Sequence, residues 1–149
     1  MIIEPNKFGK LDINVLEDFE SKNDIQLPND YAEFLKTYNG GKPHKRYLKN
    51  VKNDVSWFFS IVDEPTWASL FQAIEVFHKR IPSWYMPIAR MEGGDLLIMS
   101  LYKDNYGVIA YWNHEKEARK GKASQYFDNL TPVADSFTDL ITLLGPSPY

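Results

Sequence analysis

The sequence predicts a single α+β domain in which about four helices flank a mostly antiparallel sheet, and three observations carry this prediction. The length of 149 residues suits one domain with one core. Four segments have the 3.6-residue period of helices that bury one face. Three strand patterns late in the chain are separated only by tight-turn residues, which favours an antiparallel meander. Since no repeat or linker divides the chain, we expect residues 1–149 to form one unit.

The stretch from Leu27 to Gly41 contains the clearest helix pattern. Its large side chains recur at i, i+3, i+4 and i+7, which places them on one helix face. These side chains are Tyr31, Phe34, Leu35 and Tyr38. Pro28 or Asn29 is suited to open the helix. Asn39-Gly40-Gly41 is suited to close it, because glycine adopts the left-handed backbone of a helix end at little steric cost.

An earlier helix is expected from Asp12 or Asn14, either of which can cap it, to about Lys22. We expect its apolar residues to face inward, namely Val15, Leu16 and Phe19. After the Leu27–Gly41 stretch, the segment from Lys42 to Asn53 is basic and is predicted to be a loop with a short strand. This run is either a solvated edge segment or a docking patch for an acidic surface or a phosphate. The net negative charge of the chain favours the edge segment.

A buried strand is predicted from Val55 to Val62, which is β-branched and aromatic. Asp63-Glu-Pro65 is expected to open the next helix. Large apolar side chains follow at helical spacing, and we interpret them as core residues rather than a cofactor site. They are Trp67, Leu70, Phe71, Ile74 and Phe77.

The predicted meander comprises residues 86–91, 95–102 and 106–113, separated by Glu92-Gly93-Gly94 and Lys103-Asp104-Asn105. The charged segment 116–124 is expected to be a mobile surface connection. A last helix is predicted to start at Thr131-Pro132 and to stop at Gly145-Pro146. Its inward face would carry Val133, Phe137, Leu140, Ile141 and Leu144.

The charge and cysteine content exclude several classes of function. The chain has 17 basic and 20 acidic side chains and a net charge of −3, which argues against direct nucleic-acid binding through bulk electrostatics. It has no cysteine, which excludes disulfides, thiolate metal sites and cysteine nucleophiles. The first residues lack the pattern of a signal peptide, and no apolar run is long enough to cross a membrane. We therefore expect a cytoplasmic protein without a membrane partner.

No motif for catalysis, metal binding or cofactor binding is found in the sequence. The three histidines lack ligand spacing, and Ala118 stands where a zincin helix beginning at His114 would need its second histidine. Gly40-Gly41-Lys42 follows a helix C-terminus, the wrong polarity for a phosphate. Ser136 is expected within a helix, with its hydroxyl on solvent or a backbone carbonyl. The carboxylates of Glu92 and Asp95 are expected to keep ordinary pKa values. We expect no catalytic, cofactor or metal site.

An aromatic and acidic set of residues on strand ends and loops has no assignment in the fold. Aromatic residues ringed by charge are typical of protein interfaces. The candidate partner-binding residues are Trp84, Tyr85, Glu92, Asp104, Tyr106, His114 and Glu115. Trp112 is expected in the core instead, because strand alternation buries one of Tyr111 and Trp112.

Four stretches, in order over roughly residues 12–144, resemble the SUKH superfamily, which includes fungal cell-wall-assembly regulators and bacterial toxin-immunity proteins. They are Leu27-Pro28-x-Asp30-Tyr31-x-x-Phe34-Leu35 with Asn39-Gly40-Gly41, then Pro87-Ile88-Ala89 leading to Gly94-Asp95, then Tyr111-Trp112-Asn113-His114, then Ala134-Asp135-Ser136-Phe137-x-x-Leu140. The resemblance implies an α+β fold with a mostly antiparallel sheet. Asn113 stands where the family commonly has an acidic residue.

The resemblance also implies a binding role. The leading hypothesis is a non-enzymatic immunity protein of the cytosol that neutralises a cognate polymorphic toxin, a basic nuclease domain being the expected partner. The alternative is a regulatory or scaffolding protein for cell-wall or envelope synthesis. A hydrolase is the third hypothesis, and no residue spacing favours it. Because family members differ at the toxin surface, the resemblance assigns no contact residue.

Overall fold

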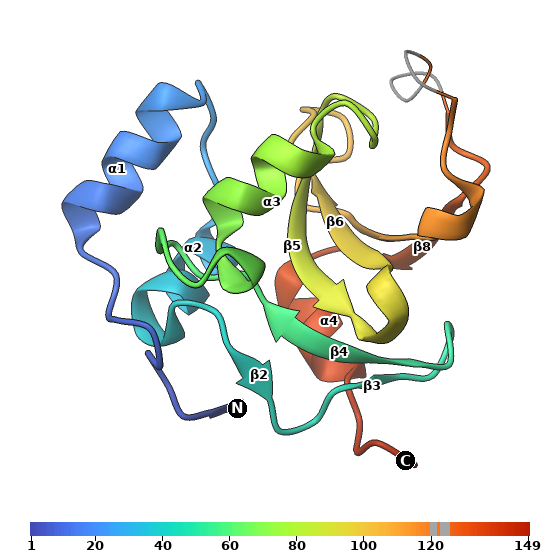
Figure 1. Ribbon diagram of the computed structural model, residues 1–149, viewed down its shortest axis with the longest axis horizontal. Helices are drawn as coiled ribbons and strands as arrows, with labels where there is room; N and C mark the ends of the chain where they lie inside the picture. Colours follow the sequence, from blue (N-terminus) through green and yellow to red (C-terminus); the bar gives the residue numbers. More distant parts are fainter. Residues whose placement is uncertain (120–121, 123–125) are drawn as a thin grey trace.

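The computed structural model describes residues 1–119, 122 and 126–149 (Figure 1). The predicted connection 116–124 falls partly outside the described residues. Within the described part of the chain, no helix is long and apolar enough to cross a membrane.

Two consecutive helices form the N-terminal part, as predicted: α1, Ile13–Lys22, and α2, Asn29–Tyr38. Asp12 caps α1, since its carboxylate accepts a hydrogen bond of 2.7 Å from the Asn14 N–H. Leu16 and Phe19 are buried, but Val15 is 41% exposed, contrary to the prediction that it faces inward. It lies beside Leu16 along the helix, so its direction is rotated by about 100° from the buried stripe.

The end of α2 ties three segments together. Asn39 has a left-handed φ of 47°, and its buried amide donates to the carbonyls of Gly9 and Ile61 and accepts from the Ile61 N–H. Gly40 follows at a φ of 77°, where a Cβ would lie 2.4 Å from the Phe58 carbonyl oxygen. The close approach of two backbones therefore requires glycine at this position.

Six antiparallel strands form the main sheet, in the order of the sequence. They are β3 (Tyr47–Leu48), β4 (Asn53–Phe58), β5 (Tyr85–Met91), β6 (Leu96–Ser100), β7 (Ile109–Trp112) and β8 (Leu130–Ala134). The predicted three-stranded meander is confirmed as β5, β6 and β7, at the centre of this sheet. A separate two-stranded sheet pairs β1, Ile2–Ile3, with β2, Lys42–Pro43.

The basic run Lys42–Asn53 contains β2 and β3, each two residues long. Because β3 is an edge strand, the lysines around it are placed where charge discourages unwanted strand pairing. Arg46 is the exception, since its Nε lies 3.6 Å from Oδ2 of the buried Asp54.

Helices cover the sheet on both faces (Figure 1). α3, Leu70–Phe77, lies across one face, where Phe77 packs 5.8 Å from Trp112 between ring centroids. α4, Phe137–Leu143, lies across the other face beside α2. There Phe137 contacts the rings of Phe34 and Phe58, at centroid distances of 4.8 and 5.7 Å.

The C-terminal helix begins later than predicted. Thr131-Pro132 lies in β8, and α4 begins at Phe137 with Ser136 as its cap, whose hydroxyl accepts from the Asp139 N–H at 3.1 Å. A threonine-proline pair suits a sheet edge as well as a helix start, because proline lacks the N–H that a central strand needs. Pairing with β7 decides between the two here.

The strand and helix around residue 60 are also shorter than predicted. β4 ends at Phe58, and the 3-10 helix η1, Thr66–Ala68, precedes α3. Ser69 caps α3 by accepting from the Gln72 N–H at 3.2 Å. Trp67 therefore lies outside the helix and is 47% exposed, although its ring contacts Trp57 at 5.1 Å.

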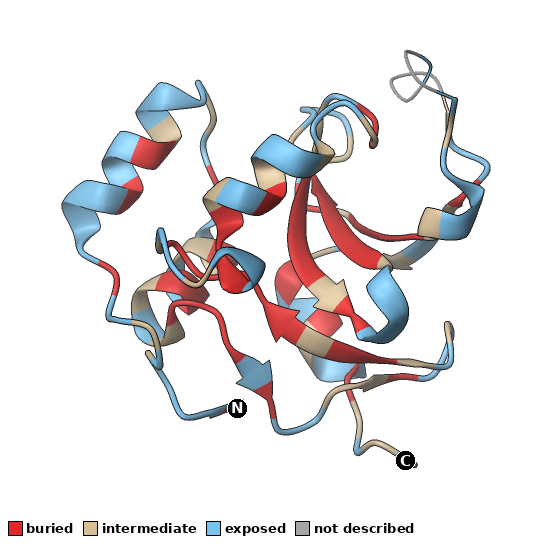
Figure 2. Ribbon diagram, viewed as in Figure 1, coloured by how far each residue is buried: buried red, intermediate tan, exposed pale blue. Residues whose placement is uncertain are grey.

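The buried core residues lie on the strands of the sheet and on the helix faces that contact it (Figure 2). Every residue of β6 is buried. Trp112 is in the core, as predicted, and Tyr111 is buried with it because both sheet faces are covered.

Candidate functional site

The candidate partner-binding residues lie at opposite ends of the meander. Antiparallel strands bring the start of β5, the end of β6 and the start of β7 to one end, and their other termini to the other end. The first end carries four of the candidates, namely Trp84, Tyr85, Asp104 and Tyr106. The second end carries Glu92 in η2, Glu92–Gly94, with His114 and Glu115 in η3, His114–Lys116. The single set of candidates thus forms two surfaces.

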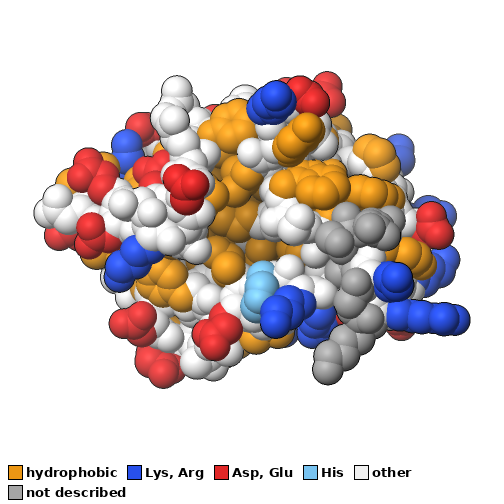
Figure 3. Space-filling view, turned by 90° about the horizontal axis from the view of Figure 1, so that it is seen from above, with side chains coloured by type: hydrophobic (Ala, Val, Ile, Leu, Met, Phe, Trp, Pro, Cys, Tyr) orange, Lys and Arg blue, Asp and Glu red, His pale blue; other side chains and the backbone are white. Residues whose placement is uncertain are grey.

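A groove occupies the first end. We define it as two adjoining hollows of about 320 and 570 Å³ that share Ile25 and Leu101. Trp84 and Tyr85 line the smaller hollow, and Tyr106 lines the larger one, below the α1–α2 corner. Figure 3 shows this face, where hydrophobic side chains fill the hollowed centre and carboxylates gather over the α1 side. The groove is therefore apolar inside and charged at its rim.

Aromatic rings extend the smaller hollow outward. Trp84 lies at centroid distances of 6.1, 6.0 and 5.7 Å from Tyr85, Tyr102 and Phe127. Tyr102 and Phe127 are each 46% exposed, so a large part of their ring surface faces solvent. Neither residue is among the sequence candidates. The available signal for Tyr102 was an aromatic residue at the end of a predicted strand, next to a turn, while only the folded chain brings Phe127 to the same tryptophan.

The larger hollow is bounded by a contact between distant segments. The Tyr106 hydroxyl donates to the Gln26 carbonyl, joining the β6–β7 loop to the α1–α2 corner. Partial burial raises the pKa of Tyr106, and the negative charges of Glu20 and Asp30 raise it further. Asp104 lies exposed on the same loop and does not line either hollow.

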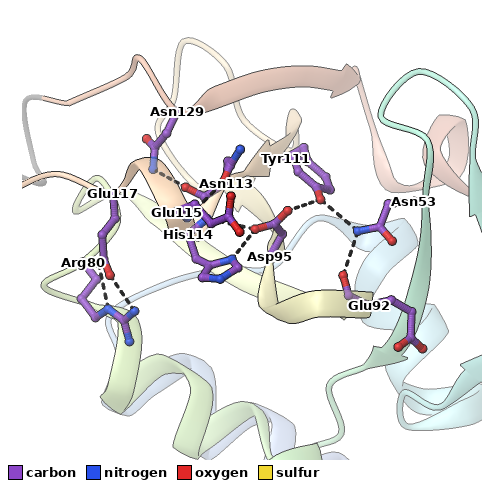
Figure 4. A network of polar contacts seen from close by, with 10 residues as sticks. All are labelled: Asn53, Arg80, Glu92, Asp95, Tyr111, Asn113, His114, Glu115, Glu117 and Asn129. Atoms are coloured by element: carbon purple, nitrogen blue, oxygen red, sulfur yellow. Dashed lines mark hydrogen bonds and ion pairs between the residues drawn. The ribbon is translucent and has the colours of Figure 1, made fainter.

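At the second end, a polar network is centred on Asp95 (Figure 4). Its carboxylate accepts hydrogen bonds from the Tyr111 hydroxyl, from the His114 N–H at 3.0 Å and from His114 Nδ1 at 2.5 Å. Asn53 donates to the Tyr111 hydroxyl at 3.0 Å and to the Glu92 carbonyl at 2.9 Å. The network joins β4, the start of β6 and the end of β7.

These surroundings lower the pKa of Asp95 from its ordinary value. Burial acts to raise it, but the hydrogen bonds from Tyr111 and His114 and the charge of His114 outweigh burial, so the pKa is lowered. Burial and the hydrogen bond to Asp95 raise the pKa of Tyr111 to about 12. The expected ordinary pKa of Asp95 is therefore wrong, because the turn encloses the carboxylate with donors.

Glu92 and Glu115 make their hydrogen bonds in this region with backbone atoms. Glu92 accepts from Asn53 with its carbonyl oxygen, and the Glu115 N–H donates to Asn113 Oδ1 at 3.0 Å. Both side chains are exposed. At the end of η3, Glu117 binds Arg80 through two hydrogen bonds of 2.9 and 3.0 Å. The Arg80 guanidinium also lies 4.8 Å from the ring centroid of Phe77. Arg80 therefore links the end of η3 to α3.

The network is suited to holding a turn rather than to catalysis. An ionised carboxylate that already accepts three hydrogen bonds is a poor general acid and has little capacity left as a base. Ser136, the candidate nucleophile of the hydrolase hypothesis, is engaged as a helix cap. In the described part of the chain, no three His, Asp or Glu side chains are grouped to hold a metal ion.

Comparison with known proteins identifies the family. Residues 10–143 match the SMI1 / KNR4 family (SUKH-1). The chain is also similar to the SPbeta prophage-derived uncharacterized protein YokK of Bacillus subtilis strain 168, with 27% identity over 168 aligned residues, covering 98% of this chain and 81% of YokK. The family match spans both helices of the N-terminal part, the six-stranded sheet and α4, and so covers nearly the whole fold. The chain therefore belongs to the SMI1/KNR4 (SUKH-1) family.

Proposed function

We propose that this chain is an immunity protein that binds a cognate protein toxin and neutralises it stoichiometrically, without enzymatic activity. The observation that carries the proposal is the aromatic-lined groove in a member of a family of immunity and regulatory proteins. Exposed Tyr, Trp and Phe side chains are the usual anchors of protein interfaces. A stable complex of this kind buries about 1,200–2,000 Å² in total.

The charge of the chain fits a basic partner such as a nuclease domain. Because the net charge is −3, long-range attraction would raise the association rate with a cationic toxin more than the final affinity. The site of action would be the cytosol of the producing cell.

The proposal is tested by capture followed by rescue. The immobilised chain is exposed to lysate from its own host at physiological salt, and each retained protein is then expressed with and without the chain. The expected result is one retained protein that arrests growth alone and is tolerated when the chain is present. Retention of envelope-synthesis enzymes that do not arrest growth would contradict the proposal and favour the regulatory alternative.

A further inference from the structure

The carboxylates of the groove lie on one side of it. From Asp12 to Asp30 the chain has six carboxylates and one lysine. Three of these carboxylates lie near the α1–α2 corner. Asp24 lines the larger hollow, and the negative charges of Glu20 and Asp30 are close enough to Tyr106 to raise its pKa. Lys103, on the loop of the opposite rim, is the basic residue of this lining. The α1 side of the groove is therefore a negatively charged wall, as Figure 3 also shows.

The smaller hollow is apolar and continuous with that wall. Ile25 and Leu101 line both hollows, so a chain seated on them reaches the Trp84 side and the Asp24 side together. Ile74 and Met86 contribute to the apolar lining near Trp84. The volume of about 320 Å³ is in the range of pockets that hold small ligands, and so admits one large apolar side chain.

We propose that the groove binds a basic segment of the partner protein, with one large apolar side chain in the hollow beside Trp84 and a neighbouring Lys or Arg against the Asp24 side. This inference rests on the proposed function, because it names the part of the toxin that the immunity protein recognises. Asp24 supplies an exposed carboxylate for the cation, and the Tyr106 ring lines the same hollow for cation–π contact. Apolar burial anchors the segment, and the charge pairing selects a basic partner.

Defined peptides test this recognition without the toxin. Three labelled peptides of one length are compared by fluorescence anisotropy: one with a central Phe flanked by Arg, a second with Glu replacing each Arg, and a third with Ser replacing the Phe. The Arg-Phe peptide is expected to bind at least about tenfold more tightly than either of the others, since it alone meets both requirements. Its affinity is expected to fall as salt is added.

Variants of the protein assign the binding to the groove. Trp84→Ala is expected to weaken binding of the Arg-Phe peptide by about tenfold or more, as removal of an aromatic anchor does. Asp24→Asn is expected to weaken it about two- to fivefold, the range of an exposed ion pair. Asparagine also tolerates the left-handed φ of 51° at this position, so the corner is retained. Trp67→Ala and Glu115→Gln, which remove an exposed tryptophan and an exposed carboxylate elsewhere, are the matched controls.

Two results would overturn the inference. One is equal affinity for the Arg and Glu peptides, or no measurable binding of either. The other is a loss in the control variants as large as the loss in Trp84→Ala. The proposed function is tested separately, by whether the natural chain neutralises the toxin. If it does, and Trp84→Ala and Asp24→Asn neutralise the toxin equally well, the toxin contacts another surface: the groove inference is overturned while the immunity role stands.

Discussion

Asp95 is expected to be the residue whose replacement most weakens the second end of the sheet. Its carboxylate accepts three hydrogen bonds, and its side chain is only 17% exposed. A hydrogen bond to a charged group contributes about 1.5–3 kcal/mol, and bonds that share one acceptor do not add in full. Because water partly replaces the lost acceptor, we expect Asp95→Ala to lower the free energy of unfolding by about 2–4 kcal/mol at pH 7.

The effect of Asp95 depends on pH in a defined direction. Its ordinary pKa is 3.8, the value expected when unfolded, and the folded pKa is lower. The ionised carboxylate therefore contributes fully to the free energy of unfolding above about pH 4, and this contribution is lost as the pH falls through the folded pKa. Asp95→Asn is expected to share most of the loss at pH 7 and to converge with the natural chain in acid.

Urea unfolding followed by circular dichroism, at intervals from pH 7 down to pH 3, measures both effects. Glu115→Gln is the control, since its exposed side chain is outside the network and should change the free energy of unfolding by less than about 0.5 kcal/mol. A loss below about 1 kcal/mol for Asp95→Ala at pH 7 would refute the reasoning. So would a difference between the natural chain and Asp95→Asn that grows on acidification below about pH 4.

Three further predictions concern the core, one backbone contact and the alkaline range. Gly40→Ala is expected to cost about 2–5 kcal/mol in a urea titration, because its Cβ would lie 2.4 Å from the Phe58 carbonyl oxygen at a φ of 77°; a cost below about 1 kcal/mol would contradict this contact. Tyr31→Phe is expected to leave the melting temperature unchanged or to raise it, since the buried Tyr31 hydroxyl has no hydrogen-bond partner among the described residues; a clear drop would show that the hydroxyl is satisfied. The protonated Tyr111 hydroxyl contributes fully to folding stability below its ordinary pKa of 10.0, and this contribution is lost as the pH rises through the folded pKa of about 12. Tyr111→Phe should therefore flatten the fall of the free energy of unfolding between pH 10 and 12. An unchanged slope of that free energy against pH would contradict the raised pKa of Tyr111.

Local signals predict the helices that carry their own boundaries. α1 and α2 follow from apolar spacing together with Asp12 at one start and Asn39-Gly40 at one end. The position of β8 is different, because Thr131-Pro132 is compatible with a helix start and only pairing with β7 makes it a strand. Ser136, five residues after Thr131, is the true cap of α4. Where a segment has two locally acceptable states, tertiary pairing decides.

The candidate site was predictable in its residue types but not in its arrangement. Trp84 and Tyr106 have the character of interface residues in the sequence, whereas the groove depends on Ile25 and Leu101, which only the fold brings together. In the sequence, Asp95 stands out as half of a carboxylate pair with Glu92 and as the end of a family-like stretch. Its actual partners lie 16 and 19 residues away, and turn geometry rather than composition aligns them. Composition therefore names candidates, and strand direction divides them into two surfaces.

The most direct test of the central claim is a titration of the captured toxin with this chain. The toxin's activity, nuclease cleavage if it is a nuclease, is measured at a fixed toxin concentration well above the dissociation constant while the chain is added. We expect a linear fall in activity that ends at one equivalent, because inhibition by a tight complex is stoichiometric. Full toxin activity in a molar excess of the chain would contradict it.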